Sequence, residues 1–194
     1  MINGSLSVVI VPGWFTQSPM YLFLKNYLER KGVKVYITNF GLHLRNIDSY
    51  ADLLASFINK KGLNDFVLVG ASVGALISYK YLQKYQAWGN IHKFISIVGP
   101  FQGSHMAKFA AWFSTSAKQM VPNSSFMKEL NSHHPDIEKT MLLEASWDEF
   151  VPKGSSTLQG VTPITLKCVG HTKSQAFCKE VYKIVLGAAL ENKE

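Results

Sequence analysis

The sequence of 194 residues has no apolar run approaching the roughly 18 residues of a membrane-spanning helix. Its first residues, MINGSLSVVIVPGW, contain no basic leader and only a short apolar run, so they do not resemble a signal peptide. We therefore expect a cytoplasmic protein, provided that Met1 is the true start. Zinc-ligand spacing, a P-loop and an aromatic-basic RNA motif are also missing, so we expect no metal, no cofactor and no nucleic-acid partner.

Only two cysteines occur, Cys168 and Cys178, which is too few to imply a disulfide framework. Cys168 ends a strand-like run, and Cys178 lies in a helix-like segment. We expect both to be small buried apolar residues rather than redox partners.

Charged residues are also sparse, at 17% of the chain against 47% apolar residues, which is the balance of an ordinary globular protein. Lysine and arginine outnumber aspartate and glutamate by 20 to 13, so the net charge is +7. This excess is compatible with anionic membranes, acyl carriers or nucleic acid as partners. Because the lysines are scattered, general solubility is the simpler interpretation.

Strand-like and helix-like segments alternate along the chain, which predicts an α/β fold with a parallel sheet covered on both faces. We expect one domain over residues 1–194, with a small cap-like or pocket-bordering segment at 100–139 that holds an apolar helix (HMAKFAAWFSTS) and a short helix (SFMKELN). The expected strands are 7–11, 34–38, 65–70, 93–98, 140–146 and 162–168. The other expected helices are about 18–32, 48–61, about 74–85 and 173–190.

The stretch GASVG, residues 70–74, places Ser72 between two glycines where a buried strand meets an amphipathic helix. A tight turn of small residues would explain this pattern without catalysis, and Gly-x-Ser-x-Gly arises by chance in about one chain of this length in twenty. The strand–turn–helix setting favours a nucleophile elbow, whose strained turn exposes the serine while Gly70 and Gly74 relieve crowding.

A nucleophilic serine needs a base held by a third group, and chains with this elbow supply them in the order serine, acid, histidine. Asp148 follows the strand expected at 140–146, and His171 follows the strand expected at 162–168. Both should therefore lie with Ser72 at the carboxyl edge of the sheet. Glu149 is the alternative acid. The remaining histidines lack such a setting and are interpreted as surface or loop residues: His43, His92, His105, His133 and His134.

The oxyanion formed during acyl transfer needs hydrogen-bond donors. The backbone N–H of Val73, directly after the serine, is one candidate, and the N–H of Trp14, in the loop after the first strand, is the other. The Trp14 side chain could also be a core aromatic residue. Side chains that could form an apolar pocket wall, or pack only on the sheet, are Phe15, Met106, Phe109, Ala110 and Phe113, and His105 could join them.

Together these motifs resemble the small serine lipases and esterases of the α/β-hydrolase fold, above all the bacterial lipase and GPI-inositol-deacylase-like branch. VVIVPGWF is similar to the family's strand and oxyanion loop, LVGASVGALISYKYLQKY to its elbow, and SWDEFVPKGSSTLQG and VGHTKS to its acid and histidine loops. The resemblance covers nearly the whole chain. It implies a minimal α/β-hydrolase fold of about six strands, with Ser72 as nucleophile, His171 as general base and Asp148 as the residue that orients it.

Three positions depart from the family's pattern: Pro12 and Ala71 replace histidines, and GPFQGS lacks a Pro-His pair. The triad is intact, so we predict an esterase or lipase that acts on a small-molecule or lipid ester through an acyl-enzyme. An apolar pocket wall and a basic surface favour peripheral contact with an anionic membrane. A thioesterase or protein deacylase would use the same triad, and a catalytically silent hydrolase-fold binding protein is a further alternative.

Overall fold

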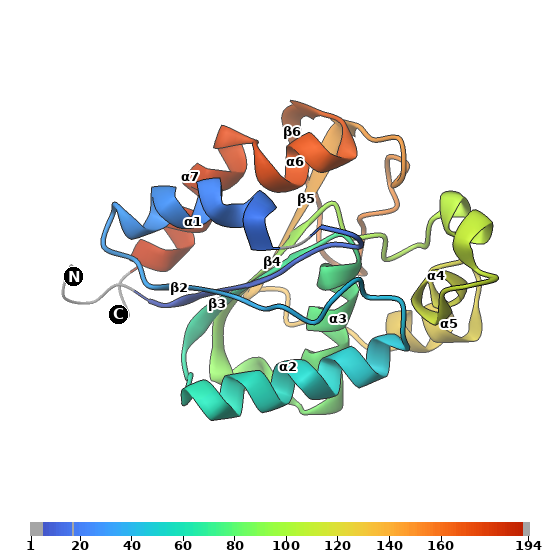
Figure 1. Ribbon diagram of the computed structural model, residues 1–194, viewed down its shortest axis with the longest axis horizontal. Coiled ribbons are helices and arrows are strands. Elements are labelled where there is room, and N and C mark those ends of the chain that lie inside the picture. The colour runs from blue at the N-terminus through green and yellow to red at the C-terminus, as the bar shows by residue number, and fades with distance from the viewer. Residues whose placement is uncertain (1–5, 17, 192–194) are drawn as a thin grey trace.

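A computed structural model describes residues 6–16 and 18–191. Its centre is a six-stranded sheet in the order β2-β1-β3-β4-β5-β6, in which every neighbouring pair is parallel (Figure 1). The predicted α/β class and all six strands are confirmed, with boundaries within two residues. The strands are β1 (Val8–Val11), β2 (Val35–Ile37), β3 (Phe66–Ala71), β4 (Ile91–Ile97), β5 (Thr140–Trp147) and β6 (Ile164–Val169).

The strand order reverses at β1. The chain runs from β1 to β2 on one side and then returns to β3 on the other side. Every residue of β1 and β3 is buried, which is the pattern of parallel strands covered on both faces. In open parallel sheets, a crevice forms at such a reversal, at the carboxyl ends of the strands. The loops after β1 and β3 therefore meet at the position where α/β proteins build their sites.

Helices cover both faces of the sheet (Figure 1). On one face lie α1 (Leu22–Glu29), which follows the short 3₁₀ helix η1 (Ser18–Tyr21), and α7 (Lys179–Leu190). On the other lie α2 (Ile47–Lys61) and α3 (Val73–Lys84), which the short 3₁₀ helix η2 (Ala87–Asn90) follows. Among residues 6–16 and 18–191, no helix has both the length and the apolar character needed to cross a membrane.

The segment expected to border the pocket forms three short helices: η3 (His105–Ala110), α4 (Thr115–Gln119) and α5 (Ser125–Asn131). The prediction of α5 is confirmed. The prediction of one apolar helix over 105–116 is wrong, because η3 is a 3₁₀ helix that ends at Ala110. The Ser114 side chain then accepts a hydrogen bond from the Ala117 N–H and starts a new helix. A serine inside an apolar run can act as an N-cap, and the apolar periodicity alone does not reveal this.

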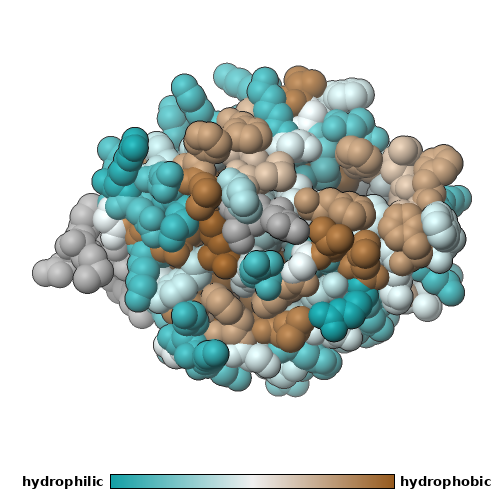
Figure 2. Space-filling model, in the orientation of Figure 1, coloured by the Kyte–Doolittle hydropathy of each residue, from teal (hydrophilic) through white to brown (hydrophobic). Residues whose placement is uncertain are grey.

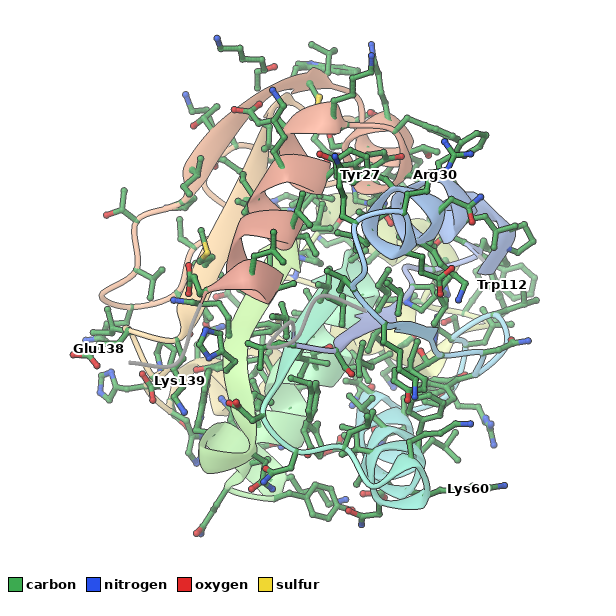
Figure 3. All side chains as sticks on the ribbon, turned by 90° about the vertical axis from the view of Figure 1, so that its left-hand side faces the viewer. Tyr27, Arg30, Lys60, Trp112, Glu138 and Lys139 are labelled. Carbon is green, nitrogen blue, oxygen red and sulfur yellow. A yellow bond between two sulfur atoms is a disulfide. The ribbon has the colours of Figure 1, made fainter. Side chains whose placement is uncertain are left out.

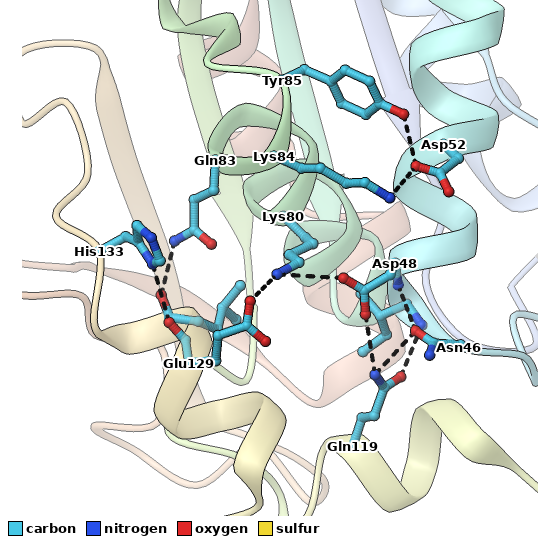
Figure 4. A network of polar contacts seen from close by, with 12 residues as sticks. Asn46, Asp48, Asp52, Lys80, Gln83, Lys84, Tyr85, Gln119, Glu129 and His133 are labelled. Atoms are coloured by element: carbon cyan, nitrogen blue, oxygen red, sulfur yellow. Dashed lines mark hydrogen bonds and ion pairs between the residues drawn. The ribbon is translucent and has the colours of Figure 1, made fainter.

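Polar contacts attach this segment to the rest of the fold (Figure 4). The Nζ of Lys80, on α3, lies 2.5 Å from Glu129 Oε1 on α5 and 3.3 Å from Asp48 Oδ1 on α2. The Gln119 amide, on α4, donates a 3.1 Å hydrogen bond to Asn46 Oδ1, directly before α2. Because the Lys80 side chain is only 9% exposed, its two carboxylate partners compensate a largely buried charge.

The C-terminal helix predicted over 173–190 is interrupted. α6 (His171–Ala176) ends at Phe177, and α7 begins after Cys178, whose ψ of 108° is extended. The prediction of a single helix is therefore wrong, and Phe177, at the interruption, is half-exposed. The apolar residues that α7 buries include Val181, Val185 and Ala188.

A disulfide joins Cys168, in β6, to Cys178, across a Cα–Cα distance of 6.0 Å. The expectation that these cysteines are unpaired apolar residues is therefore wrong. Ten positions separate them along the chain, but α6 turns the chain back toward β6. That return depends on the interruption before α7, which the continuous apolar pattern of the segment conceals.

Candidate active site

Ser72 forms the turn between β3 and α3, in a backbone conformation that L-residues rarely adopt (φ +51°, ψ −122°). The neighbouring glycines make this turn possible. A Cβ atom at Gly70 would lie 2.5 Å from the Cα of Ala75, and one at Gly74 would lie 2.2 Å from the carbonyl oxygen of Val11. The helix thus packs against the strands too closely for a side chain at either position, and the strained turn holds Ser72 at the carboxyl edge of the sheet.

Three side chains meet at this edge, as the strand order predicts. The Oγ of Ser72 lies 2.9 Å from the Nε2 of His171, and the Nδ1 of His171 lies 2.7 Å from the Oδ2 of Asp148. A carboxylate only accepts hydrogen bonds, so Nδ1 carries the ring proton and Nε2 is left to accept from the Ser72 hydroxyl. A hydroxyl bonded to an imidazole that is itself held by a carboxylate is the arrangement that activates a nucleophile.

The carboxylate of Asp148 is fixed from both ends. Its Oδ1 accepts hydrogen bonds of 2.8 Å from the backbone N–H groups of Phe150 and Val151, and its side chain is only 3% exposed. The adjacent Glu149 instead accepts from the backbone N–H of His171, at 2.9 Å. Asp148 therefore bonds to the imidazole of His171, and Glu149 bonds to its backbone. The acid that orients the imidazole is Asp148 rather than the alternative, Glu149.

Ser72 and His171 border a cavity of about 500 Å³. Its other walls are largely apolar and come mainly from the loop after β1, from η3, from the end of α4 and from the loop after β5. A mostly apolar cavity with a few convergent polar groups is the usual form of a small-molecule site. The apolar lining includes Trp14, Phe15, Met106, Met120, Phe150 and Val151.

The predicted pocket residues divide into two groups. Phe15 and Met106 line the cavity, but Phe109 and Phe113 do not. Phe109 is 75% exposed, and the Phe113 ring stacks on Trp14 with ring centroids 6.3 Å apart. His105 is also exposed and lies outside the lining. Met106, Phe109, Ala110 and Phe113 were expected to form one wall from a single helix, and the change of helix type and the break after Ala110 separate them.

The loop after β1 packs directly on the serine. A Cβ atom at Gly13 would lie only 3.1 Å from the Cβ of Ser72. Trp14 follows in the cavity wall, and Val73 is the first residue of α3. Both residues expected to supply oxyanion donors therefore lie beside Ser72.

A buried hydrogen-bond network behind this loop was not anticipated from the sequence. The Tyr21 hydroxyl accepts from the Gly13 N–H at 3.1 Å, donates to the Oε1 of Gln175 at 2.9 Å, and lies 3.2 Å from the Thr16 hydroxyl. Complete burial raises the pKa of Tyr21 to about 12. The hydroxyl therefore keeps its proton at neutral pH.

His43 lies in a loop, as expected, but it is buried rather than on the surface. It is 1% exposed, and its Nδ1 lies 3.1 Å from the carbonyl oxygen of Gly13, to which it donates. Burial lowers the pKa of His43, and the hydrogen bond to Gly13 opposes this only in part. The segment around it, GLHLRN, gives no signal of burial, because the contacts of His43 with Gly13 and Tyr50 form only in the folded chain.

Comparison with known proteins places this geometry in context. The family model of lecithin:cholesterol acyltransferase matches residues 42–177, more than half of the chain. A protein of Mycoplasma genitalium described as an esterase/lipase is 30% identical over 106 residues. That match covers 46% of this chain and 39% of the relative, so the chain spans well under two thirds of the relative's length.

Solved structures of lipases share the fold. A Bacillus licheniformis lipase has a TM-score of 0.73 at 15% identity, over 95% of this chain and 93% of that one. Aspergillus fumigatus lipase B gives 0.79 at 16%, and phospholipase PlaB from Legionella pneumophila gives 0.81 at 12%; each matches 98% of this chain but only 53% and 59% of theirs, respectively. The predicted α/β-hydrolase fold and the resemblance to lipases and esterases are confirmed.

Proposed function

Because the chain belongs to the lecithin:cholesterol acyltransferase family, we propose that it is a serine hydrolase that cleaves carboxylic esters through an acyl-enzyme. One observation carries this proposal. An unbroken line of hydrogen bonds runs from the Ser72 hydroxyl through the imidazole of His171 to the buried carboxylate of Asp148, at the edge of an apolar cavity.

In the first half of the reaction, the Oγ of Ser72 bonds to the ester carbonyl carbon while its proton passes to the Nε2 of His171. Collapse of the tetrahedral intermediate breaks the bond to the alcohol oxygen, which takes the proton from Nε2. Water then gives a proton to the same Nε2 as its oxygen bonds to the acyl carbon. Collapse of this second intermediate breaks the bond to the Oγ of Ser72, which takes the proton back from Nε2, and the acid is released. Asp148 holds the tautomer and stabilises the imidazolium that forms at each step.

The negative oxygen of each tetrahedral intermediate is assigned to the N–H groups of Val73 and Trp14. Val73 lies at the N-terminal end of α3, where the partial positive charge of the helix dipole favours an anion. Loss of one such donor typically lowers kcat by about 100- to 1000-fold. The apolar cavity wall fits the hydrocarbon part of a small-molecule or lipid ester.

Exposed apolar side chains lie in the cavity wall and beside it: Phe15 and Met106 line the cavity, Phe113 stacks on Trp14, and Trp112 contacts Phe113. Together with the exposed Phe109 of η3, Phe15, Met106, Trp112 and Phe113 are here called the apolar rim. Figure 2 shows hydrophobic residues in several groups on the visible face, and Trp112, 86% exposed, lies at the edge of the molecule in Figure 3. Residues 99–128 contain Lys108, Lys118 and Lys128 but no aspartate or glutamate. This combination supports peripheral contact with an anionic lipid surface, from which an acyl chain could enter the cavity.

Vesicle sedimentation tests the membrane contact. We expect binding to vesicles that contain phosphatidylglycerol, weaker binding to pure phosphatidylcholine, and loss of binding in a Phe109→Ala/Trp112→Ala double variant. Ile137→Ala is the matched control, because Ile137 is 57% exposed but precedes β5 and so lies at the opposite edge of the sheet. Equal binding by all three proteins would refute a role for the apolar rim.

Hydrolysis of a chromogenic ester series from acetyl to palmitoyl tests the reaction itself. We expect turnover by the wild type, none by Ser72→Ala, and covalent labelling of Ser72 by a fluorophosphonate. Turnover that survives in Ser72→Ala would exclude the proposed nucleophile. Activity confined to thioesters or acylated peptides would favour the thioesterase or protein deacylase alternative, and absence of both turnover and labelling would favour a silent binding protein.

A further inference from the structure

Gly13, directly before the proposed oxyanion donor Trp14, has both of its backbone polar groups bonded to buried side chains. Its N–H donates to the Tyr21 hydroxyl at 3.1 Å, and its carbonyl oxygen accepts from the Nδ1 of His43 at 3.1 Å and, at the longer distance of 3.3 Å, from the backbone N–H of Thr16. Tyr21 and His43 are 0% and 1% exposed, respectively. They come from different parts of the chain, η1 and the loop after β2, and hold Gly13 through opposite ends of the residue.

The hydrogen bond from His43 to the Gly13 carbonyl also affects the direction of the Trp14 N–H. The C=O of Gly13 and the N–H of Trp14 belong to one planar peptide group, and in a trans peptide they point in opposite directions. Any side chain that holds this C=O therefore fixes the Trp14 N–H on the opposite side. The direction of a hydrogen bond to an oxyanion matters, because the bond weakens steeply as the angle at hydrogen falls toward about 120°.

The network of Tyr21 determines which N–H group remains for the substrate. The single hydroxyl proton goes to Gln175 Oε1, so the oxygen's lone pairs accept from the Gly13 N–H and the Thr16 hydroxyl. The N–H of Gly13 is thus already used, and the next N–H along the loop is that of Trp14. Gln175 belongs to α6, the helix that begins with His171, so one network joins the oxyanion loop to the helix of the proposed base.

We propose that His43 and Tyr21 are positioning residues that orient the Trp14 N–H toward the oxyanion. The proposal rests on the proposed ester hydrolysis and deepens it, because neither side chain needs to touch the substrate. Between them, they hold the two peptide groups that flank Gly13.

Two features of His43 lower the stability of the fold. Its φ of +58° lies in the left-handed region, and its Nε2 is buried without a hydrogen-bond partner in the described part of the chain. A buried polar atom without a hydrogen-bond partner destabilises the fold, and backbone strain of this kind concentrates at functional sites. Holding the Gly13 carbonyl is a function that would offset these costs.

The test compares His43→Gly, His43→Asn and Tyr21→Phe with the wild type. Glycine accepts the positive φ but removes the donor, whereas asparagine tolerates the same φ and retains an amide N–H near the position of Nδ1. We expect kcat of His43→Gly to fall by about 10- to 100-fold, less than loss of a whole oxyanion donor, with KM within about 3-fold. His43→Asn should recover part of this loss, and Tyr21→Phe should reproduce it.

A second readout separates orientation from general loosening of the fold. The affinity of a boronic acid, whose tetrahedral adduct with Ser72 mimics the transition state, should fall across the variants in proportion to kcat/KM. If His43→Gly does not fold, the test is made with Tyr21→Phe, because this variant keeps the ring and loses only the hydroxyl.

The proposal fails if the folded variants keep kcat/KM within 2-fold of the wild type. It also fails if the variants lose kcat/KM only through a higher KM, or if their affinity for the boronic acid does not fall together with kcat/KM. In those cases, an inactive Ser72→Ala beside an active wild type would leave the proposed hydrolysis standing. If the wild type neither turns over esters nor reacts at Ser72, the hydrolysis and this inference both fail.

Discussion

The Nε2 of His171 lies 2.9 Å from the Oγ of Ser72, although 99 positions separate the two residues along the chain. Parallel strands explain this proximity. Ser72 follows β3 and His171 follows β6, and the carboxyl ends of parallel strands share one edge of the sheet. The Asp148 carboxylate contacts the same imidazole. It follows β5, which lies between β3 and β6 along the chain.

Adjacent carboxylates on the loop after β5 allow a matched comparison. We expect Asp148→Asn to lower kcat by about 10³- to 10⁴-fold, because an amide can hold the imidazole in the wrong tautomer. Glu149→Gln should lower it by less than about 10-fold, because Glu149 bonds only to the backbone N–H of His171 and an amide oxygen still accepts there. Steady-state ester hydrolysis measures both, and equal losses would show that the assignment of the acid is wrong.

The disulfide encloses the helix that begins with His171. Replacing Cys168 and Cys178 together by serine should lower the free energy of unfolding by about 2–3 kcal/mol, the loop-entropy value for a bridge across ten residues. The variant should also lose turnover, because the turn that carries His171 gains freedom. Urea unfolding and ester hydrolysis test this, with the wild type in reductant as control. Unchanged stability and rate would show that the bridge holds neither.

Stability should depend on pH through His43. Burial lowers its pKa in the folded protein, while the unfolded chain keeps a value near 6.5. Between these two values the unfolded state binds more protons, so the stability is complete above about pH 6.5 and is lost as pH falls toward the folded pKa, by at most about 1.4 kcal/mol per unit. The ring of Tyr50 packs on the His43 ring with ring centroids 4.9 Å apart, and the Arg45 guanidinium lies over the Tyr50 ring.

Comparing His43→Asn with the wild type isolates this contribution, because asparagine does not titrate. We expect a smaller loss of urea stability between pH 7 and pH 5 in the variant. The same slope in both proteins would assign the acid sensitivity to other groups.

The ion pairs of Lys80 provide a test on stability alone. Asp48→Asn/Glu129→Gln would leave the 9%-exposed Lys80 charge without an anionic partner and should lower the free energy of unfolding by about 3–5 kcal/mol. Glu129→Gln alone should cost much less, because Asp48 remains 3.3 Å away. Thermal or urea unfolding measures both. Similar losses in the single and double variants would mean that Asp48 does not compensate the charge.

Local patterns in the sequence were sufficient to predict the strands of the sheet and the three residues that meet at its carboxyl edge. The apolar runs predicted all six strands. For the central strands β1 and β3 the run reflects burial between two helical layers, whereas the edge strand β6 is mostly exposed. Ser72, Asp148 and His171 were found because each directly follows such a strand, so their meeting depends only on strand direction. The glycines around Ser72 marked the close approach of α3 to the sheet.

Tertiary structure decided the features that depend on contacts between distant segments. Tyr21 reaches Gln175 across 154 positions, and His43 is buried only when its polar loop folds beneath Gly13. The bond between Cys168 and Cys178 requires a break in a helix that the apolar periodicity predicts to be continuous. A sequence pattern reports the surroundings of a residue through its neighbours, whereas these contacts arise only when separate elements pack against one another.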